Sequence, residues 1–163
     1  MTHGTNLNPD TLQRLVAMFA RHPCIWASEG ASAQELDRAA QALGVQLPDD
    51  YRDFVMRFGG GHAGSLPVAG LRVWDTASAG EWSVIELTDR YRIENWPGTE
   101  AWAVISNDGC GNPIGLDALG RVWLSDHDAQ ECVCLESSFD NWLRRCAMRV
   151  ERPGEYIERF AWS

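Results

Sequence analysis

The chain has 163 residues, of which 45% are hydrophobic, and a formal net charge of −9. This composition is typical of a single folded domain with a real core and excludes an intrinsically disordered chain. The acidic balance argues against direct binding to nucleic acid. The polar first residues and the short apolar runs predict neither a secretory signal nor a membrane span, so we expect a cytoplasmic protein.

The five cysteines are odd in number and scattered, which is typical of reduced thiols. Cys132 and Cys134 would share one face of a strand. Together with Cys110 and His127 they could hold a metal ion, but no Cys-x-x-Cys pair is present. We therefore interpret them as small apolar side chains of the core and predict no metal and no cofactor.

Two helices are predicted near the N-terminus. The first covers residues 8–22 and opens with Asn8 as a cap and Pro9 in the first turn. Its apolar stripe is predicted to be Leu12, Leu15, Val16 and Phe19. The second begins at the capping box Ser32-Ala33-Gln34-Glu35 and ends at Gly44.

A third helix follows Leu47-Pro48, because Pro and the two acids after it favour a first turn. It is predicted to bury Tyr51, Phe54, Val55 and Phe58 and to end at the glycine run 59–61. Residues 66–74 predict an irregular edge strand, since they include Pro67 and Gly70. Residues 81–93 predict a fourth helix.

Residues 101–136 predict an antiparallel meander. Its short runs of Val, Ile, Leu and Trp are separated by turns at 107–109, 117–120 and 125–128. These connections are too short for a parallel crossover, so neighbouring strands should pair as hairpins. The fold class is therefore α+β, with a mainly antiparallel sheet of about five to six strands covered by N-terminal helices and a C-terminal helix.

After the sheet, Ser137 or Ser138 is predicted to cap a last helix that carries Phe139 and Trp142. The extension 150–163 ends in an aromatic-rich segment, which either docks on the core or contacts a partner. No linker or repeat divides the chain, so residues 1–163 are predicted to form one domain.

The catalytic signals are weak. The run Ser125-Asp126-His127-Asp128 has the residue types of a hydrolase, but the chain has no Gly-x-Ser-x-Gly elbow and a triad is defined by geometry. Asp126 and Asp128 fall in a predicted turn, where Asp is ordinary. We therefore predict that the protein is not an enzyme, with a small hydrolase or metal enzyme based on His127 and Asp126 as the less favoured alternative.

Acidic residues concentrate in the predicted sheet. Nine carboxylates lie between Glu94 and Asp140, and only Arg121 opposes them. Three tryptophans at the ends of elements lie beside acids and could anchor a protein partner, although ordinary rim packing explains each of them as well. The predicted partner-binding residues are Trp74, Glu81, Trp82, Glu94, Trp96, Asp108, Asp126, Asp128 and Glu131.

Three segments in order resemble the SUKH superfamily. They are ELDRAAQALGVQLPDDYRDFVMRFGGG, ISNDGCGNPIGLDALGRVWLSDHD and SSFDNWL, which together span roughly residues 34–145. The resemblance implies an α+β domain. It also implies structural roles for Leu43, Gly44, Leu47, Pro48, Tyr51, Phe54, Gly59 and Gly60, and turn-shaping roles for Asp108, Gly109, Gly111, Asp117, Gly120, Asp126 and His127.

The resemblance further implies a function. Most bacterial members of the superfamily look like immunity proteins that neutralise toxin domains, whereas fungal relatives regulate cell-wall synthesis through protein contacts. We therefore expect an immunity protein that occludes a cognate toxin domain, with a regulatory scaffold as the alternative. The acidic charge of the predicted sheet, and not the resemblance, favours a basic nuclease or deaminase as that toxin. No nucleic acid or membrane partner is expected, and the protein is expected to be a monomer or weak homodimer.

Overall fold

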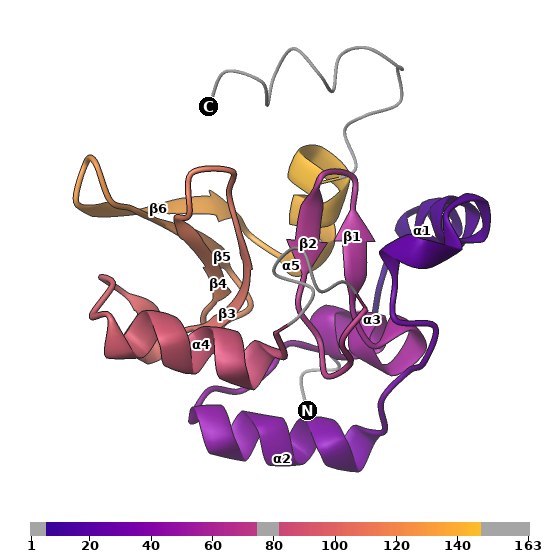
Figure 1. Cartoon of the computed structure of the whole chain (residues 1–163), viewed down its shortest axis with the longest axis horizontal. Coiled ribbons are helices and arrows are strands. Elements are labelled where there is room, and N and C mark those ends of the chain that lie inside the picture. The colour runs from indigo at the N-terminus through magenta and orange to yellow at the C-terminus, as the bar shows by residue number, and fades with distance from the viewer. Residues whose placement is uncertain (1–5, 75–81, 148–163) are drawn as a thin grey trace.

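A computed structural model describes residues 6–74 and 82–147, with the backbone alone described at 146 and 147. Glu81 and the extension 150–163 therefore lie outside the described residues. Figure 1 shows a four-stranded sheet with α4 on one side, and a two-stranded hairpin between the sheet and α1. The architecture is α+β with two antiparallel sheets, as predicted.

The first helix, α1 (Pro9–Arg21), begins where predicted, because the Asn8 side chain accepts a hydrogen bond of 2.9 Å from the Asp10 N–H. Its predicted stripe is partly wrong. Leu15 and Phe19 are buried, but Val16 is 52% exposed and Thr11 is buried instead. Leu12 and Met18 are half-buried and pack against the core on the flanks of the same face, whereas Val16 lies just outside that face.

The next two helices agree with the sequence signals. In α2 (Ala33–Leu43) the Ser32 hydroxyl and the Glu35 carboxylate form the predicted capping box, and Gly44 ends the helix at φ 68°. In α3 (Asp49–Phe58) all four predicted apolar side chains are buried. The Tyr51 hydroxyl donates a hydrogen bond of 2.6 Å to the Ala69 carbonyl, which joins α3 to the segment that follows residues 66–68.

The glycine run does more than end α3. Gly59 ends the helix at φ 75°, but Gly61 already starts β1 (Gly61–Ala63), which pairs with β2 (Leu66–Val68). The predicted edge strand 66–74 is thus reduced to three residues, and its partner strand was not predicted. Side chains at Gly60 and Gly61 would collide with Trp74 and Trp26, so only glycine lets the chain pass here.

The fourth helix, α4 (Val84–Ile93), begins three residues later than predicted. Ser83 and Glu86 form a second capping box, which sets the start of the helix. Val84, Leu87, Thr88 and Tyr91 are buried. Thr88 Oγ1 accepts a hydrogen bond of 2.8 Å from the Val104 N–H, so this bond joins α4 directly to the first strand of the main sheet.

The main sheet is the predicted meander, with the strand order β3 (Ala103–Asn107), β4 (Pro113–Leu116), β5 (Val122–Asp126) and β6 (Glu131–Glu136). All neighbouring pairs are antiparallel. After the sheet, Ser138 rather than Ser137 caps α5 (Phe139–Trp142), and a π-helical turn over Leu143–Ala147 (η4) follows.

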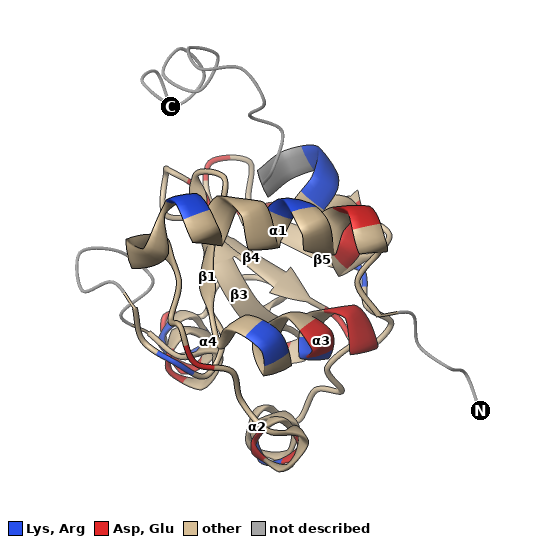
Figure 2. Ribbon diagram, turned by 90° about the vertical axis from the view of Figure 1, so that its right-hand side faces the viewer, with Lys and Arg blue, Asp and Glu red and all other residues tan. Residues whose placement is uncertain are grey.

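Two apolar clusters lie on the two faces of the main sheet. Ala103 and Ile105 face the large cluster formed with α1, α2, α3 and α5, whereas Val104 faces the small cluster formed with Leu87 and Tyr91 of α4. This follows from the alternation of side chains along a strand. Figure 2 shows α1 and α3 in front of the first of these faces. Among the described residues, no helix is both long enough and apolar enough to cross a bilayer.

Candidate protein-interaction surface

Three aromatic rings connect the end of α4 to the β5–β6 turn. Tyr91 lies on α4, Trp96 follows the helix, and His127 lies in the turn. The Tyr91 and Trp96 ring centroids are 5.5 Å apart, and those of Trp96 and His127 are 5.2 Å apart. In Figure 1 the C-terminal end of α4 and the β5–β6 turn lie on the same, left side of the molecule.

The β3–β4 turn joins this group through one backbone carbonyl and one side-chain amide. The Tyr91 hydroxyl donates a hydrogen bond of 2.9 Å to the Gly111 carbonyl, and the His127 N–H donates one of 3.0 Å to Asn112 Oδ1. The Asp108 carboxylate accepts hydrogen bonds from the N–H groups of Cys110 and Asn112. Asp108 therefore shapes the turn, which is the role that the family resemblance implied for it.

The β5–β6 turn supplies most of the negative charge. Asp126 Oδ1 accepts from the Asp128 and Ala129 N–H groups at 2.9 and 3.1 Å, so this carboxylate also shapes its turn. Asp128 and Glu131 are exposed. Glu131 lies directly opposite Asp126 in the β5–β6 register, where two like charges repel each other.

We call this group the acidic end surface, defined as Glu94, Trp96, Asp108, Asp126, His127, Asp128 and Glu131. The Glu94 carboxylate accepts a hydrogen bond of 3.0 Å from the Trp96 indole N–H and forms an ion pair of 3.7 Å with Arg90. Within the described part of the chain, no ion pair involves any of the other four acids. Among the described residues, four of the five acids of the surface therefore lie around a half-buried indole without a paired cation.

The structure brings together most, but not all, of the predicted partner-binding residues. Trp82 precedes α4 and packs on the same small cluster as Trp96. Its ring centroid lies 5.5 Å from Cζ of Arg90, so Trp82 borders the acidic end surface. Trp74 lies apart from the acidic end surface, since its indole N–H donates a hydrogen bond of 3.2 Å to the His62 ring on β1. Glu81 is outside the described residues.

A hollow of about 380 Å³ borders the acidic end surface. Trp96, Asn95 and Glu100 line it together with Arg92, Pro97 and Thr99. Arg92 is committed to the fold, because its guanidinium donates to the carbonyls of Leu43, Thr99 and Trp102. The hollow is large enough to receive one side chain of a partner beside the Trp96 indole.

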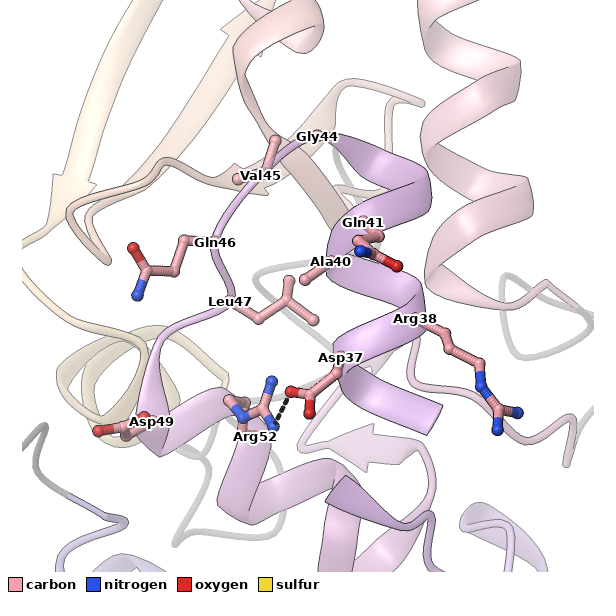
Figure 3. A pocket seen from close by; sticks show the side chains of 10 residues that line it. All are labelled: Asp37, Arg38, Ala40, Gln41, Gly44, Val45, Gln46, Leu47, Asp49 and Arg52. Carbon is pink, nitrogen blue, oxygen red and sulfur yellow. Dashed lines mark hydrogen bonds and ion pairs between the residues drawn. The ribbon is translucent and has the colours of Figure 1, made fainter. Parts of the chain in front are cut away.

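A second hollow of about 640 Å³ lies between α2 and the start of α3 (Figure 3). Asp37 and Arg52 pair across it at 2.7 Å, and the side chains of Gln46 and Asp49 border it from the connecting loop and α3. Its charged side chains are either paired with each other or exposed to solvent. Nothing here combines an aromatic anchor with uncompensated charge, as the acidic end surface does.

The hydrolase residue types of the β5–β6 region do not form a catalytic constellation. The Ser125 side chain is buried, the Asp126 carboxylate accepts from backbone N–H groups, and the His127 ring packs on Trp96. No hydrogen bond joins these three side chains to one another. Across residues 6–74 and 82–147, no three His, Cys, Asp or Glu side chains are grouped as a metal ion would require.

Cys132 and Cys134 were wrongly interpreted as core residues. They do share one face of β6, as predicted, but both are exposed, because the core clusters of the described chain do not reach the faces of β6 at residues 131–134. Although Cys132 is exposed as a residue, its Sγ lies 3.4 Å from the Pro97 carbonyl, and the partial desolvation of the sulfur, together with the nearby Glu100 carboxylate, raises the pKa of the thiol. It is therefore a poor thiolate at neutral pH.

Sequence reasoning missed two residues that hold the surface together, Tyr91 and Asn112. Tyr91 lies within the predicted helix over residues 81–93, but no sequence signal indicates that its hydroxyl would reach the β3–β4 turn. Asn112 directly follows the Asp108-Gly-Cys-Gly turn, a position that was visible in the sequence. Its side chain accepts a hydrogen bond from the His127 N–H, which lies in the β5–β6 turn. This partner could not be recognised from the sequence.

Aromatic anchors and free acids that gather on turns, away from any catalytic constellation, are typical of a protein-interaction module. A family model, the SMI1 / KNR4 family (SUKH-1), matches residues 30–145. Because the match covers more than half of the chain, the protein belongs to this family, and the expected span of 34–145 is confirmed within four residues. Membership supports an interaction role of the immunity or SMI1/KNR4 type in a generally non-enzymatic family. A search of curated proteins found no match.

Proposed function

We propose that the protein is an immunity protein that binds a cognate toxin domain one to one, in the cytoplasm, and neutralises it by covering its active site. The observation that supports this proposal is the acidic end surface, where Trp96 lies near four acids, Asp108, Asp126, Asp128 and Glu131, that have no ion-pair partner in the described chain. Family membership supports the same class of function.

The charge of the surface favours a basic target. A nuclease or deaminase that acts on nucleic acid needs a positively charged cleft, and an acidic surface that fits this cleft excludes the substrate. Long-range attraction speeds the encounter between partners, whereas buried aromatic anchors determine how long the complex lasts. Asp128 and Glu131 would therefore act on association, and Trp96 on dissociation.

The test is a titration of the purified protein against the toxin domain encoded beside its gene. We expect inhibition to be complete at a ratio of one to one and to weaken as salt is raised. Genomic context separates this function from a regulatory scaffold of the SMI1/KNR4 type. A gene without a toxin neighbour, whose product binds endogenous proteins instead, would favour the scaffold.

A further inference from the structure

The outer edge of the main sheet is open. β6 is the last strand in the order β3-β4-β5-β6 and pairs with β5 on one side, and no described segment pairs with its other side. With six residues it is also the longest strand of the sheet. Every second residue of an edge strand directs its backbone N–H and C=O outward, so β6 offers a row of hydrogen-bonding groups.

The usual protections of an edge strand are weak here. β6 contains no Pro and no Lys, and the one irregularity of its register faces Val122 and Trp123, opposite its C-terminal end. The side chains of residues 131–134 are exposed, and Val133 is 39% exposed. A regular, exposed edge of this kind is a template for one more strand.

The charge at the start of β6 selects among possible occupants. Asp126 and Glu131 face each other across the β5–β6 pair, Asp128 lies in the turn between them, and no arginine of the described chain pairs with any of the three. A second copy would bring the same acids and another net charge of −9 to this edge. A cationic strand would instead relieve the repulsion between Asp126 and Glu131.

We propose that the toxin docks by adding a basic, extended segment of its own to the outer edge of β6. This inference rests on the proposed function and specifies how the partner binds. Successive side chains of the added strand lie on opposite faces of the sheet. The segment therefore places an Arg or Lys beside Glu131 and an apolar side chain beside Val133 on one face. On the other face it contacts Cys132 and Cys134.

Amide hydrogen exchange tests the inference directly. The ¹⁵N-labelled protein is measured free and in complex with a catalytically inactive form of the toxin domain encoded beside its gene. We expect every second amide of β6 to exchange at least tenfold more slowly in the complex, while the intervening amides, already bonded to β5, change little. A complex that leaves the β6 amides unchanged overturns the inference and leaves the proposed function intact, whereas the absence of any complex overturns both.

The free protein distinguishes the other occupants. If the outward amides of β6 are already slow in the free protein at every concentration, a segment of the same chain covers the edge. If they are slow only at high concentration, a second copy covers it. Either result overturns the inference.

Proline variants at neighbouring positions give a matched pair. The N–H groups of Cys132 and Val133 point to opposite sides of β6, so Cys132→Pro and Val133→Pro each remove a different one. One variant loses a bond to β5 and lowers the melting temperature. The other should weaken toxin binding at least tenfold with a smaller loss of stability. Equal toxin affinity for the more stable variant and the wild type would contradict the inference, and the exchange measurement remains decisive if both variants unfold.

Discussion

The Trp96 indole lies against the His127 imidazole, with ring centroids 5.2 Å apart and an interplanar angle of 46°. Trp96 follows α4, which covers one face of the sheet, and His127 lies in the turn between the two outer strands. This contact, together with the hydrogen bond from the Tyr91 hydroxyl to the Gly111 carbonyl, brings the aromatic and the acidic parts of the surface together. The acidic end surface therefore exists only when α4 is docked on the sheet.

Replacement of Trp96 should separate binding from folding. We expect Trp96→Ala to weaken toxin binding at least tenfold, the size of effect expected of a central aromatic anchor. Its effect on the free energy of unfolding should be about 1–2 kcal/mol, because the ring is only half-buried. Calorimetric titration and urea unfolding give the two quantities.

Trp74→Ala is the matched control for Trp96→Ala. Trp74 is also half-buried and also donates a side-chain hydrogen bond, to His62, but it lies outside the acidic end surface. It should lose a similar amount of stability and keep its affinity for the toxin. If instead Trp74→Ala weakens binding and Trp96→Ala does not, the surface has been wrongly located.

Neutralising the free acids should slow association. We expect the double variant Asp128→Asn/Glu131→Gln to lower the association rate constant several-fold at low salt and to flatten its salt dependence, while the dissociation rate changes little. Stability should stay the same or rise slightly, because the repulsion between Asp126 and Glu131 is removed. Stopped-flow measurements over a range of salt concentrations give both rate constants.

A control with the same change in net charge is Asp10→Asn/Asp49→Asn. These exposed acids lie in the first turns of α1 and α3, on the side of the molecule seen in Figure 2. They stabilise the helix ends, so each should cost about 0.3–1 kcal/mol of stability. An equal slowing of association by this pair would mean that only the total charge matters.

Asp117 should make stability depend on pH. Burial alone would raise the pKa of its carboxyl group, but hydrogen bonds from the Trp123 indole, Arg121 and the Leu119 N–H outweigh burial and hold the pKa below its ordinary value. A pKa lowered by folding stabilises the fold above the unfolded value of about 3.9, and this stabilisation is lost as the pH falls through the folded value.

The variant Asp117→Asn tests this dependence. It should lower the free energy of unfolding by about 1–3 kcal/mol near pH 7, because one acceptor oxygen and the charge are lost from a half-buried network. The difference from the wild type should shrink below pH 4, as measured by urea unfolding at several pH values. Asp37→Asn, whose exposed carboxylate pairs with Arg52, should cost at most about 1 kcal/mol.

Arg92 should be irreplaceable even by lysine. Its guanidinium donates three hydrogen bonds, of 2.9 Å to the Leu43 carbonyl, 2.8 Å to the Thr99 carbonyl and 3.0 Å to the Trp102 carbonyl. Arg92 therefore joins the end of α2 to the segment before β3. We expect Arg92→Lys to lower the free energy of unfolding by about 2–4 kcal/mol, because an ammonium group cannot reach three separated carbonyls.

Arg90→Lys is the control for Arg92→Lys. Arg90 is exposed on the same helix, where it lies 3.7 Å from Glu94 and over the Trp82 ring. Its replacement should change stability by less than about 1 kcal/mol in thermal or urea unfolding. Equal losses for the two variants would show that the three carbonyl contacts of Arg92 add little.

Local signals predicted much of the fold. The Ser32 capping box, Gly44 after α2 and the turn that begins at Asp117 were all confirmed, because each depends on residues within five positions of one another. The second capping box, Ser83 with Glu86, carried the same signal, but the helix over residues 81–93 was predicted without it and so began three residues too early.

The errors occurred where an assignment depended on a distant neighbour. Val16 fits a helical stripe but is exposed, because it lies just outside the face of α1, with Leu12, Leu15 and Phe19, that meets the core. Cys132 and Cys134 fit a buried strand but are exposed, because neither apolar cluster of the described chain extends over the faces of β6 at these residues. Hydrophobic pattern predicts that a residue can be buried, but the packing of helices on the sheet decides whether another element covers it.

The amino-acid sequence by itself determined the fold class, the hairpin order of the main sheet, the acidity of its turns and the family, since these follow from periodicity, turn chemistry and motif spacing. Only the tertiary structure decided which acids and aromatics meet. It grouped Trp96 with His127 and Asp108 and left Trp74 with His62, because residues far apart in the chain become neighbours only through the packing of α4 on the sheet.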